Sequence, residues 1–138
     1  MTLIPAPRHW AASYIGRPWS VEQDCYAFVR EVYQARYGVA IPLVALDATR
    51  ALSCAHAIHD YDLSDWVEVD EPREGDVVLM GHARRPHHVG LWIEPAGLCV
   101  LHSVEGAGVV AQEPAQARLQ GWNLLRTHRH RDVAGGRA

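Results

Sequence analysis

The sequence is poor in the features that mark several large classes of protein. Its three cysteines, Cys25, Cys54 and Cys99, are too few and too unevenly spaced for a disulfide framework or a zinc ribbon. This scarcity favours synthesis in a reducing compartment. The net charge is only −3, and the chain contains no long basic block. Both observations argue against a nucleic-acid partner.

Two further absences concern membranes and export. No apolar run approaches the ~20 residues that span a bilayer, so we expect no membrane insertion. The start, MTLIP, has neither a basic nor an apolar signal region. We therefore expect synthesis in the cytoplasm without a signal peptide. No repeat, linker or glycine-rich phosphate loop is present, which predicts one domain over residues 1–131 and a frayed tail over 132–138.

The most informative stretch surrounds the first cysteine. Asp24 is a suitable N-cap and Gly38 a suitable left-handed C′ residue for a helix between them. Ser20 with Gln23 offers a competing capping box one turn earlier. Apolar side chains recur with helical spacing on one face of this stretch, at Cys25, Phe28, Val29, Val32 and Tyr33.

A cysteine in the first turn of a helix is well placed for nucleophilic catalysis. The helix dipole favours thiolate there, so we expect Cys25 to have a depressed pKa and to react faster with iodoacetamide than the other cysteines. A small buried core residue is an equally good interpretation of this stretch alone. The choice depends on whether the chain supplies a base.

The rest of the chain predicts an α+β domain. A second helix is expected over residues 47–58, with Asp47 as its N-cap. Helices then give way to closely connected strands, the pattern of N-terminal helices packed on a mostly antiparallel sheet. The expected strands cover residues 66–69, 76–80, 88–93, 98–104, 109–111 and 122–127.

Two histidines flank the turn that contains Pro95-Ala96-Gly97. Because side chains alternate along strands, His88 and His102 share a face in a hairpin whose paired residue numbers sum to 190 or 192. The first register places them directly opposite and the second makes them diagonal neighbours. A helix docked on that face would bring Cys25 to one imidazole, which is the thiol–base–orienter arrangement of a cysteine peptidase.

Several motifs in this order carry a resemblance to a known family. They are Asp24-Cys25 at a helix start, GDVV at 75–78, HVGLWI at 88–93 and VLHS at 100–103. Together they resemble the NlpC-type cell-wall cysteine peptidases, a family with a papain-like α+β fold that cleaves peptidoglycan stem peptides. The resemblance extends from about Trp10 to Thr127.

The resemblance implies roles for individual residues. Cys25 would be the nucleophile, His88 the base and His102 the orienting residue. Tyr14 and the backbone N–H of Cys25 would hold the oxyanion, and Asp24 would have a supporting role. The implied bond is the one between D-glutamate and the diamino acid of the stem, and no step calls for a metal or other cofactor.

One departure narrows the resemblance. Peptidoglycan-remodelling members have Ser-Gly after the cysteine, whereas this chain has Tyr26-Ala27. Together with the segments 15–19 and 38–42, this looks more like the phage tail-assembly branch. That branch implies a place in a phage or prophage tail, contacts with other tail proteins, and action on the periplasmic cell wall.

Three alternatives remain at this point. His82, His87, His88 and His102 could bind zinc, but their spacing matches no standard ligand pattern. The chain could be a structural tail component with a vestigial site. It could also be a thiol amidase or acyltransferase on the same fold. Metal analysis, thiol reactivity and product masses, respectively, distinguish these alternatives.

Overall fold

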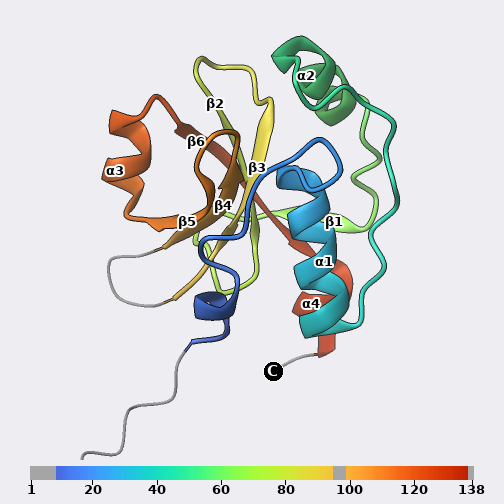
Figure 1. The fold of residues 1–138 in the computed structure, drawn as a ribbon. Coiled ribbons are helices and arrows are strands. Elements are labelled where there is room, and N and C mark those ends of the chain that lie inside the picture. The colour runs from blue at the N-terminus through green and yellow to red at the C-terminus, as the bar shows by residue number, and fades with distance from the viewer. Residues whose placement is uncertain (1–8, 95–98, 137–138) are drawn as a thin grey trace, which may run out of the picture.

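The computed structural model describes residues 9–94 and 99–136, which form an antiparallel sheet with helices on both faces (Figure 1). The strand order is β1-β6-β2-β3-β4-β5, so the predicted α+β class is confirmed. The helical elements are η1 (Trp10–Ser13), α1 (Cys25–Tyr37), α2 (Ala51–His59), α3 (Pro114–Leu119) and α4 (Arg131–Gly136). The strands are β1 (Trp66–Glu68), β2 (Val77–Gly81), β3 (His88–Trp92), β4 (Val100–Val104), β5 (Gly108–Gln112) and β6 (Asn123–His130).

The helix predicted after Asp24 is confirmed as α1. The Asp24 carboxylate accepts a hydrogen bond of 2.7 Å from the backbone N–H of Ala27. Gly38 ends the helix in the left-handed region at φ +64°, where glycine carries no steric penalty. The competing start lies outside the helix, because the Ser20 hydroxyl accepts from the Gln23 N–H within a separate turn.

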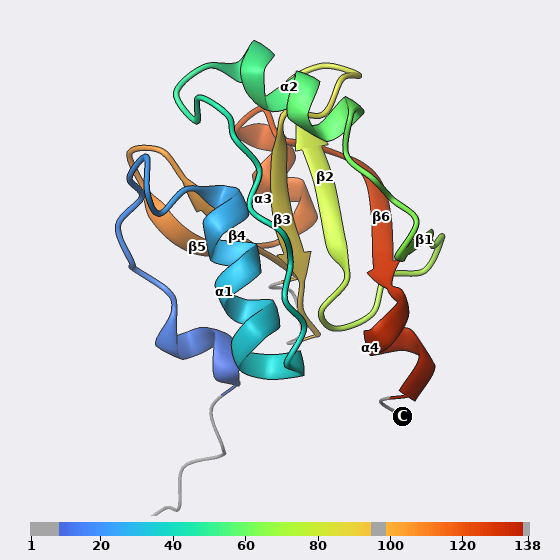
Figure 2. The same ribbon diagram turned by 90° about the vertical axis from the view of Figure 1, so that its right-hand side faces the viewer.

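Helices α1 and α3 lie on opposite faces of the sheet, as Figures 1 and 2 both show. The alternation of side chains along β2 explains how one strand serves both. Val77 and Leu79 belong to the core beneath α1, whereas Val78 and Met80 pack with Ala117 of α3. All four of these side chains are therefore buried, although they point to different sides of the sheet.

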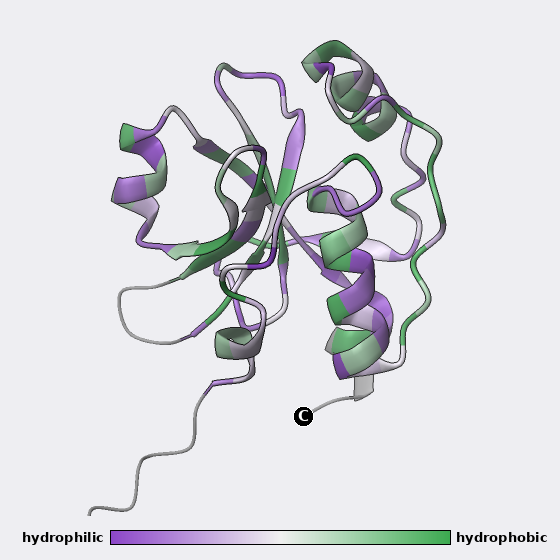
Figure 3. Ribbon diagram, in the orientation of Figure 1, coloured by the Kyte–Doolittle hydropathy of each residue, from purple (hydrophilic) through white to green (hydrophobic). Residues whose placement is uncertain are grey.

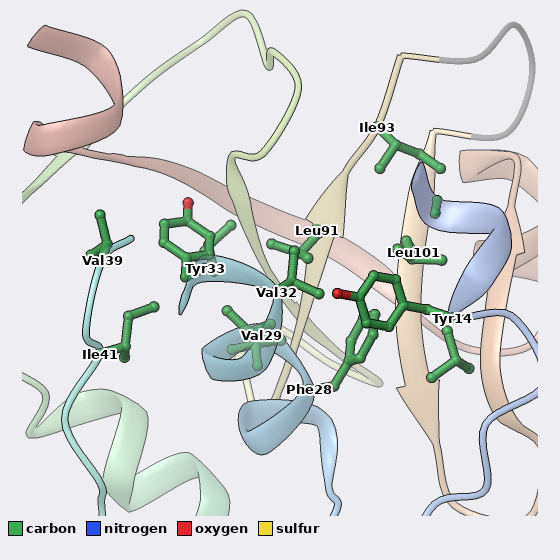
Figure 4. Close-up of a cluster of buried hydrophobic side chains, with 14 of the residues drawn as sticks. Tyr14, Phe28, Val29, Val32, Tyr33, Val39, Ile41, Leu91, Ile93 and Leu101 are labelled. Atoms are coloured by element: carbon green, nitrogen blue, oxygen red, sulfur yellow. The ribbon is translucent and has the colours of Figure 1, made fainter. Parts of the chain in front are cut away.

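The larger core lies between α1 and the sheet (Figure 4). Phe28, Val29 and Val32 of α1 pack there with Leu91 of β3 and Leu101 of β4. Both hydropathy colours appear along α1 in Figure 3, as expected for a helix with one buried face. Burial of this face fixes the rotation of α1 about its axis and thereby the direction of its first turn.

An ion pair with a buried carboxylate explains the Gly75-Asp76 motif that precedes β2. Asp76 is 1% exposed, and its carboxylate accepts from Nε and Nη2 of Arg129 on β6 at 2.9 and 2.8 Å. Gly75 has φ +89° and packs against the Tyr37 ring, where a Cβ would collide with the hydroxyl. The Tyr33 hydroxyl donates to the Gly75 carbonyl. This corner therefore joins α1, β2 and β6.

The helical boundaries differ from the prediction at three places. Helix α2 begins at Ala51, not near Asp47, because the Asp47 carboxylate accepts from the Thr49 N–H and hydroxyl in a local turn. Helix α3 lies in a segment to which no element was assigned. Helix α4 occupies residues 131–136, where we expected a frayed tail from residue 132.

Candidate active site

The structure places the three predicted site residues on three neighbouring elements. Cys25 is the first residue of α1, His88 the first of β3, and His102 lies in the middle of β4. Nε2 of His88 lies 2.9 Å from Nδ1 of His102, and both rings are buried. The two histidines singled out in the sequence therefore form a hydrogen-bonded pair in the structure.

The hairpin register is the second of the two predicted alternatives. Leu91 pairs with Leu101 and Trp92 with Val100, so paired numbers sum to 192. In this register Gly90 lies opposite His102, and a Cβ on Gly90 would lie only 3.0 Å from Cβ of His102. Glycine at this position gives the His102 side chain its room. The turn at 95–98, on which the register prediction was based, lies outside the described residues.

The expectation that α1 docks on the histidine face is wrong. Val89 and Leu91 of β3 pack beneath α1, so His88, which alternates with them, belongs to the face that α3 covers. The registered pairing of β3 with β4 extends only over Leu91 and Trp92, whereas β4 pairs with β5 along its whole length. Cys25 thus lies near the end of the sheet where β3 is no longer paired with β4.

Cys25 and His88 line one cavity of about 530 Å³. The backbone N–H of Val89, the residue after His88, lies toward the Cys25 sulfur and favours its thiolate form. Apolar side chains from α1, α2 and the connection between them form a large part of the remaining wall. They include Val29, Ile41, Val44, Leu46, Ala51 and Ile58.

Trp122 covers the histidine pair from the side. Its ring stacks on His88 with centroids 4.2 Å apart and meets His102 edge-on at 6.2 Å. On the loop between β2 and β3, His82 lies 4.1 Å from the same indole. The sequence predicted a strand to begin at Trp122 but no role for its ring. Stacking fixes the plane of the His88 imidazole and restricts the access of water to it.

Gln112, at the end of β5, is a second residue that the sequence analysis missed. Its Oε1 lies 2.7 Å from Nε2 of His102, and its side chain is buried. The signal was present, because Gln112 lies two residues after Val110, the residue paired with His102, and therefore shares its face. A polar side chain two residues from Val110 must lie on the same face of the sheet as the histidines.

Burial sets the protonation of the resting site. Desolvation, reinforced by the Asp24 carboxylate, raises the pKa of Cys25 from 9.0 to about 12, despite the opposing effect of the Val89 N–H. Burial also lowers the pKa of His88 well below 6.5, with His102 adding to the shift, and lowers that of His102. The expectation of a depressed cysteine pKa is therefore wrong, because burial favours a neutral thiol and a neutral imidazole.

The other aromatic residues near the N-terminus divide between core and cavity. The Tyr14 ring packs edge-on against Phe28 in the core, and Tyr14 does not figure among the described residues that line the cavity. Its oxyanion role therefore stays a prediction. Trp19 lines the cavity, as do Cys54 and His59.

The four histidines of the alternative metal site have other partners. His88 and His102 bond to each other, and Nδ1 of His82 lies 2.9 Å from the Gly121 carbonyl oxygen. In the part of the chain that the structure describes, no group of three or more His, Cys, Asp or Glu side chains could hold a metal ion. The donor set therefore gives no support to a zinc site.

A helix-borne cysteine that shares a cavity with a paired imidazole is an arrangement that thiol hydrolases use. The comparison with protein families shows the family to which the chain belongs. Residues 10–127 match the model of the NlpC/P60 family, so the chain belongs to that family, as the sequence motifs indicated. This family comprises cysteine peptidases and amidases that act on cell-wall peptidoglycan.

The search of curated proteins found no match. None of the helices formed by residues 9–94 and 99–136 is long and apolar enough to cross a membrane.

Proposed function

We propose that this chain is a cysteine endopeptidase that hydrolyses peptidoglycan stem peptides at the bond between D-glutamate and the diamino acid. The observation that carries the proposal is the placement of Cys25 in one cavity with His88, whose Nε2 is bonded to His102. Family membership supports the cell-wall substrate, and the choice of bond rests on the resemblance of the sequence motifs.

In the acylation step, the Cys25 sulfur attacks the scissile carbonyl carbon while its proton passes to Nδ1 of His88, the ring nitrogen that His102 leaves free. The backbone N–H of Cys25 stabilises the oxyanion, with the Tyr14 hydroxyl as its proposed partner. His88 then gives the proton to the leaving amine, and the C–N bond breaks to form a thioester. Water, deprotonated by His88, hydrolyses the thioester and restores the thiol.

The neutral resting state determines how this reaction begins. Since burial raises the pKa of Cys25 and lowers that of His88, the proposed proton transfer to His88 is coupled to the attack on the carbonyl. A bound substrate that displaces water and supplies the electrophile favours this coupled step.

Arg126 is a candidate for recognition of the substrate carboxylates. It lies on β6 at the cavity, and among the described lining residues it is the only lysine or arginine. No carboxylate of the described residues forms an ion pair with it. A stem peptide carries free carboxylates next to the scissile bond. A guanidinium can bind such a carboxylate through two parallel hydrogen bonds.

Purified muropeptides test the proposal. The wild-type protein is expected to release fragments cut between D-glutamate and the diamino acid, whereas Cys25→Ala should release none. Cys99→Ala is the matched control and should cleave like the wild type. Added chelator should change nothing. Identical fragment patterns from wild type and folded Cys25→Ala would instead identify a vestigial site in a structural protein.

A second candidate is a thiol amidase or acyltransferase. The predominance of apolar side chains around Cys25 favours it, because an acyl group or apolar side chain would be well accommodated there. The same digest distinguishes the two, because transfer to an acceptor amine gives a product of higher mass, and an amidase releases the whole peptide from the sugar.

We further propose that the protein works as part of a phage or prophage tail. The support is the Tyr26-Ala27 sequence after the cysteine, which resembles the tail-assembly branch. In that setting other tail proteins would carry the domain to the periplasmic cell wall. Co-purification with tail particles, detected by peptide mass spectrometry, tests this location, and a protein found only outside the particles would exclude it.

A further inference from the structure

A chain of three hydrogen bonds leads away from His88 into the protein. Nε2 of His88 lies 2.9 Å from Nδ1 of His102, whose Nε2 lies 2.7 Å from Oε1 of Gln112. Nε2 of Gln112 then donates to Oε1 of Gln120 at 2.9 Å. Three of the four side chains are buried, and only Gln120 is exposed. The last two bonds have no part in the reaction as described above.

The direction of this chain determines which nitrogen of each imidazole carries a proton. A carboxamide oxygen only accepts, so Gln112 Oε1 requires N–H at Nε2 of His102. Nδ1 of a neutral His102 is then an acceptor and requires N–H at Nε2 of His88. Nδ1 of His88 is consequently left with a lone pair, which is the form that can take the Cys25 proton.

The opposite direction would disable the base. If Gln112 presented its amide nitrogen to His102, the proton of His102 would move to Nδ1 and that of His88 to its own Nδ1. A protonated Nδ1 cannot accept the thiol proton. Gln120 Oε1, as the acceptor for Gln112 Nε2, holds the Gln112 amide in the productive direction.

We infer that Gln112 is a positioning residue of the active site, which selects the tautomer of His102 and through it the tautomer of His88 that accepts the thiol proton. Gln112 touches neither substrate nor sulfur, because it lies behind His102 and is not among the described residues that line the cavity. The inference also gives a role to α3. This helix begins two residues after Gln112, and Gln120 is its C-cap residue.

The inference rests on the proposed function for its catalytic meaning, but its central test needs no substrate. The ¹⁵N chemical shifts of the labelled histidines report which ring nitrogen is protonated. In the wild-type protein at pH 7.5 we expect His88 and His102 both to carry the proton on Nε2. A proton on Nδ1 of His88 would overturn the inference, whatever the outcome of the peptidase assay.

Two substitutions of Gln112 test the causal step. Gln112→Leu removes the acceptor, so both histidines should become tautomer mixtures and kcat on muropeptides should fall roughly ten- to hundredfold with little change in KM. Gln112→Glu keeps an acceptor, so the tautomers and most of kcat should be retained. The added charge should shift the acid limb of the pH profile upwards, because a carboxylate stabilises the protonated ring.

Gln34→Leu is the matched control, since Gln34 is exposed on α1 and the chemical change is the same. It should leave tautomers and kcat unchanged. If Gln112→Leu behaved like Gln34→Leu in both measurements, Gln112 would have only a packing role. If Gln112→Leu failed to fold, Gln112→Glu would decide, because an unshifted pH profile with altered tautomers would contradict the inference.

Discussion

At the scale of single residues, His88 and His102 form one hydrogen-bonded pair but are expected to differ when replaced. His88 must exchange a proton with Cys25 and the leaving amine, which no amide can do. His88→Asn should therefore lose activity on the scale of the ~10²–10⁴-fold that general acid–base catalysis contributes. His102 only accepts from His88 and donates to Gln112. A glutamine can do both, so His102→Gln should keep a measurable fraction of kcat, and His102→Asn should keep some.

His102→Ala provides the comparison within this series. It leaves the N–H of His88 and the Oε1 of Gln112 without partners in a buried site, so it should lose more activity than His102→Gln. Turnover is measured on muropeptides, with circular dichroism to show that each variant is folded. Near-normal turnover of His88→Asn, or a His102→Gln variant as inactive as His88→Asn, would contradict the assigned roles.

The place of a residue in the site could be predicted from the sequence where a local or periodic rule applies to it. Cys25 followed from a helix cap, and the histidine pair from strand alternation across one turn. The pKa of Cys25 did not follow, because the helix dipole is local but the desolvation comes from a cavity wall built by distant segments. Trp122 was missed because its partners His82, His88 and His102 lie on a loop and two strands that no single hairpin relates. Gln112 was missed because the pairing of β4 with β5, which places it on the face of His102, was not considered.

At the scale of elements, the ion pair of the buried Asp76 with the partly exposed Arg129 joins the start of β2 to β6 and supports the corner against which α1 rests. Asp76→Ala removes two hydrogen bonds between charged groups, so the free energy of unfolding should fall by roughly 1.5–3 kcal/mol, the range for hydrogen bonds to charged groups. Asp60→Ala, at a pair whose side chains are about 80% exposed, is the control and should leave stability unchanged. Urea unfolding measures both. Equal stability of the two variants would show that the pair contributes nothing.

The caps and packing of the helices explain why some of them were predicted from the sequence and others were not. Helix α1 has a cap, a stop and a continuous apolar stripe within its own sequence. Helix α2 has no side-chain cap hydrogen bond, and the apparent cap at Asp47 is used in a turn. Helix α3 is only six residues long and is held by a capping box at Glu113 and by packing of Ala117 on the sheet. Short helices of this kind depend on tertiary contacts that periodicity does not record.

At the scale of the whole molecule, burial of ionisable groups at the site should give a stability plateau between about pH 6.5 and 9. Below 6.5 the unfolded chain binds protons that the buried histidines His88, His102 and His128 resist, so stability falls with pH. Above 9.0 the unfolded chain releases the Cys25 proton that the folded protein retains to about 12, so stability falls again. Thermal unfolding followed from pH 5 to 10 should show both limbs. His102→Gln should flatten the acid limb and Cys25→Ala the alkaline one, since each removes a titrating group. A Tm that rises as the pH falls from 7 to 5 would mean that the histidines gain partners on folding, and the neutral imidazole pair would be wrong.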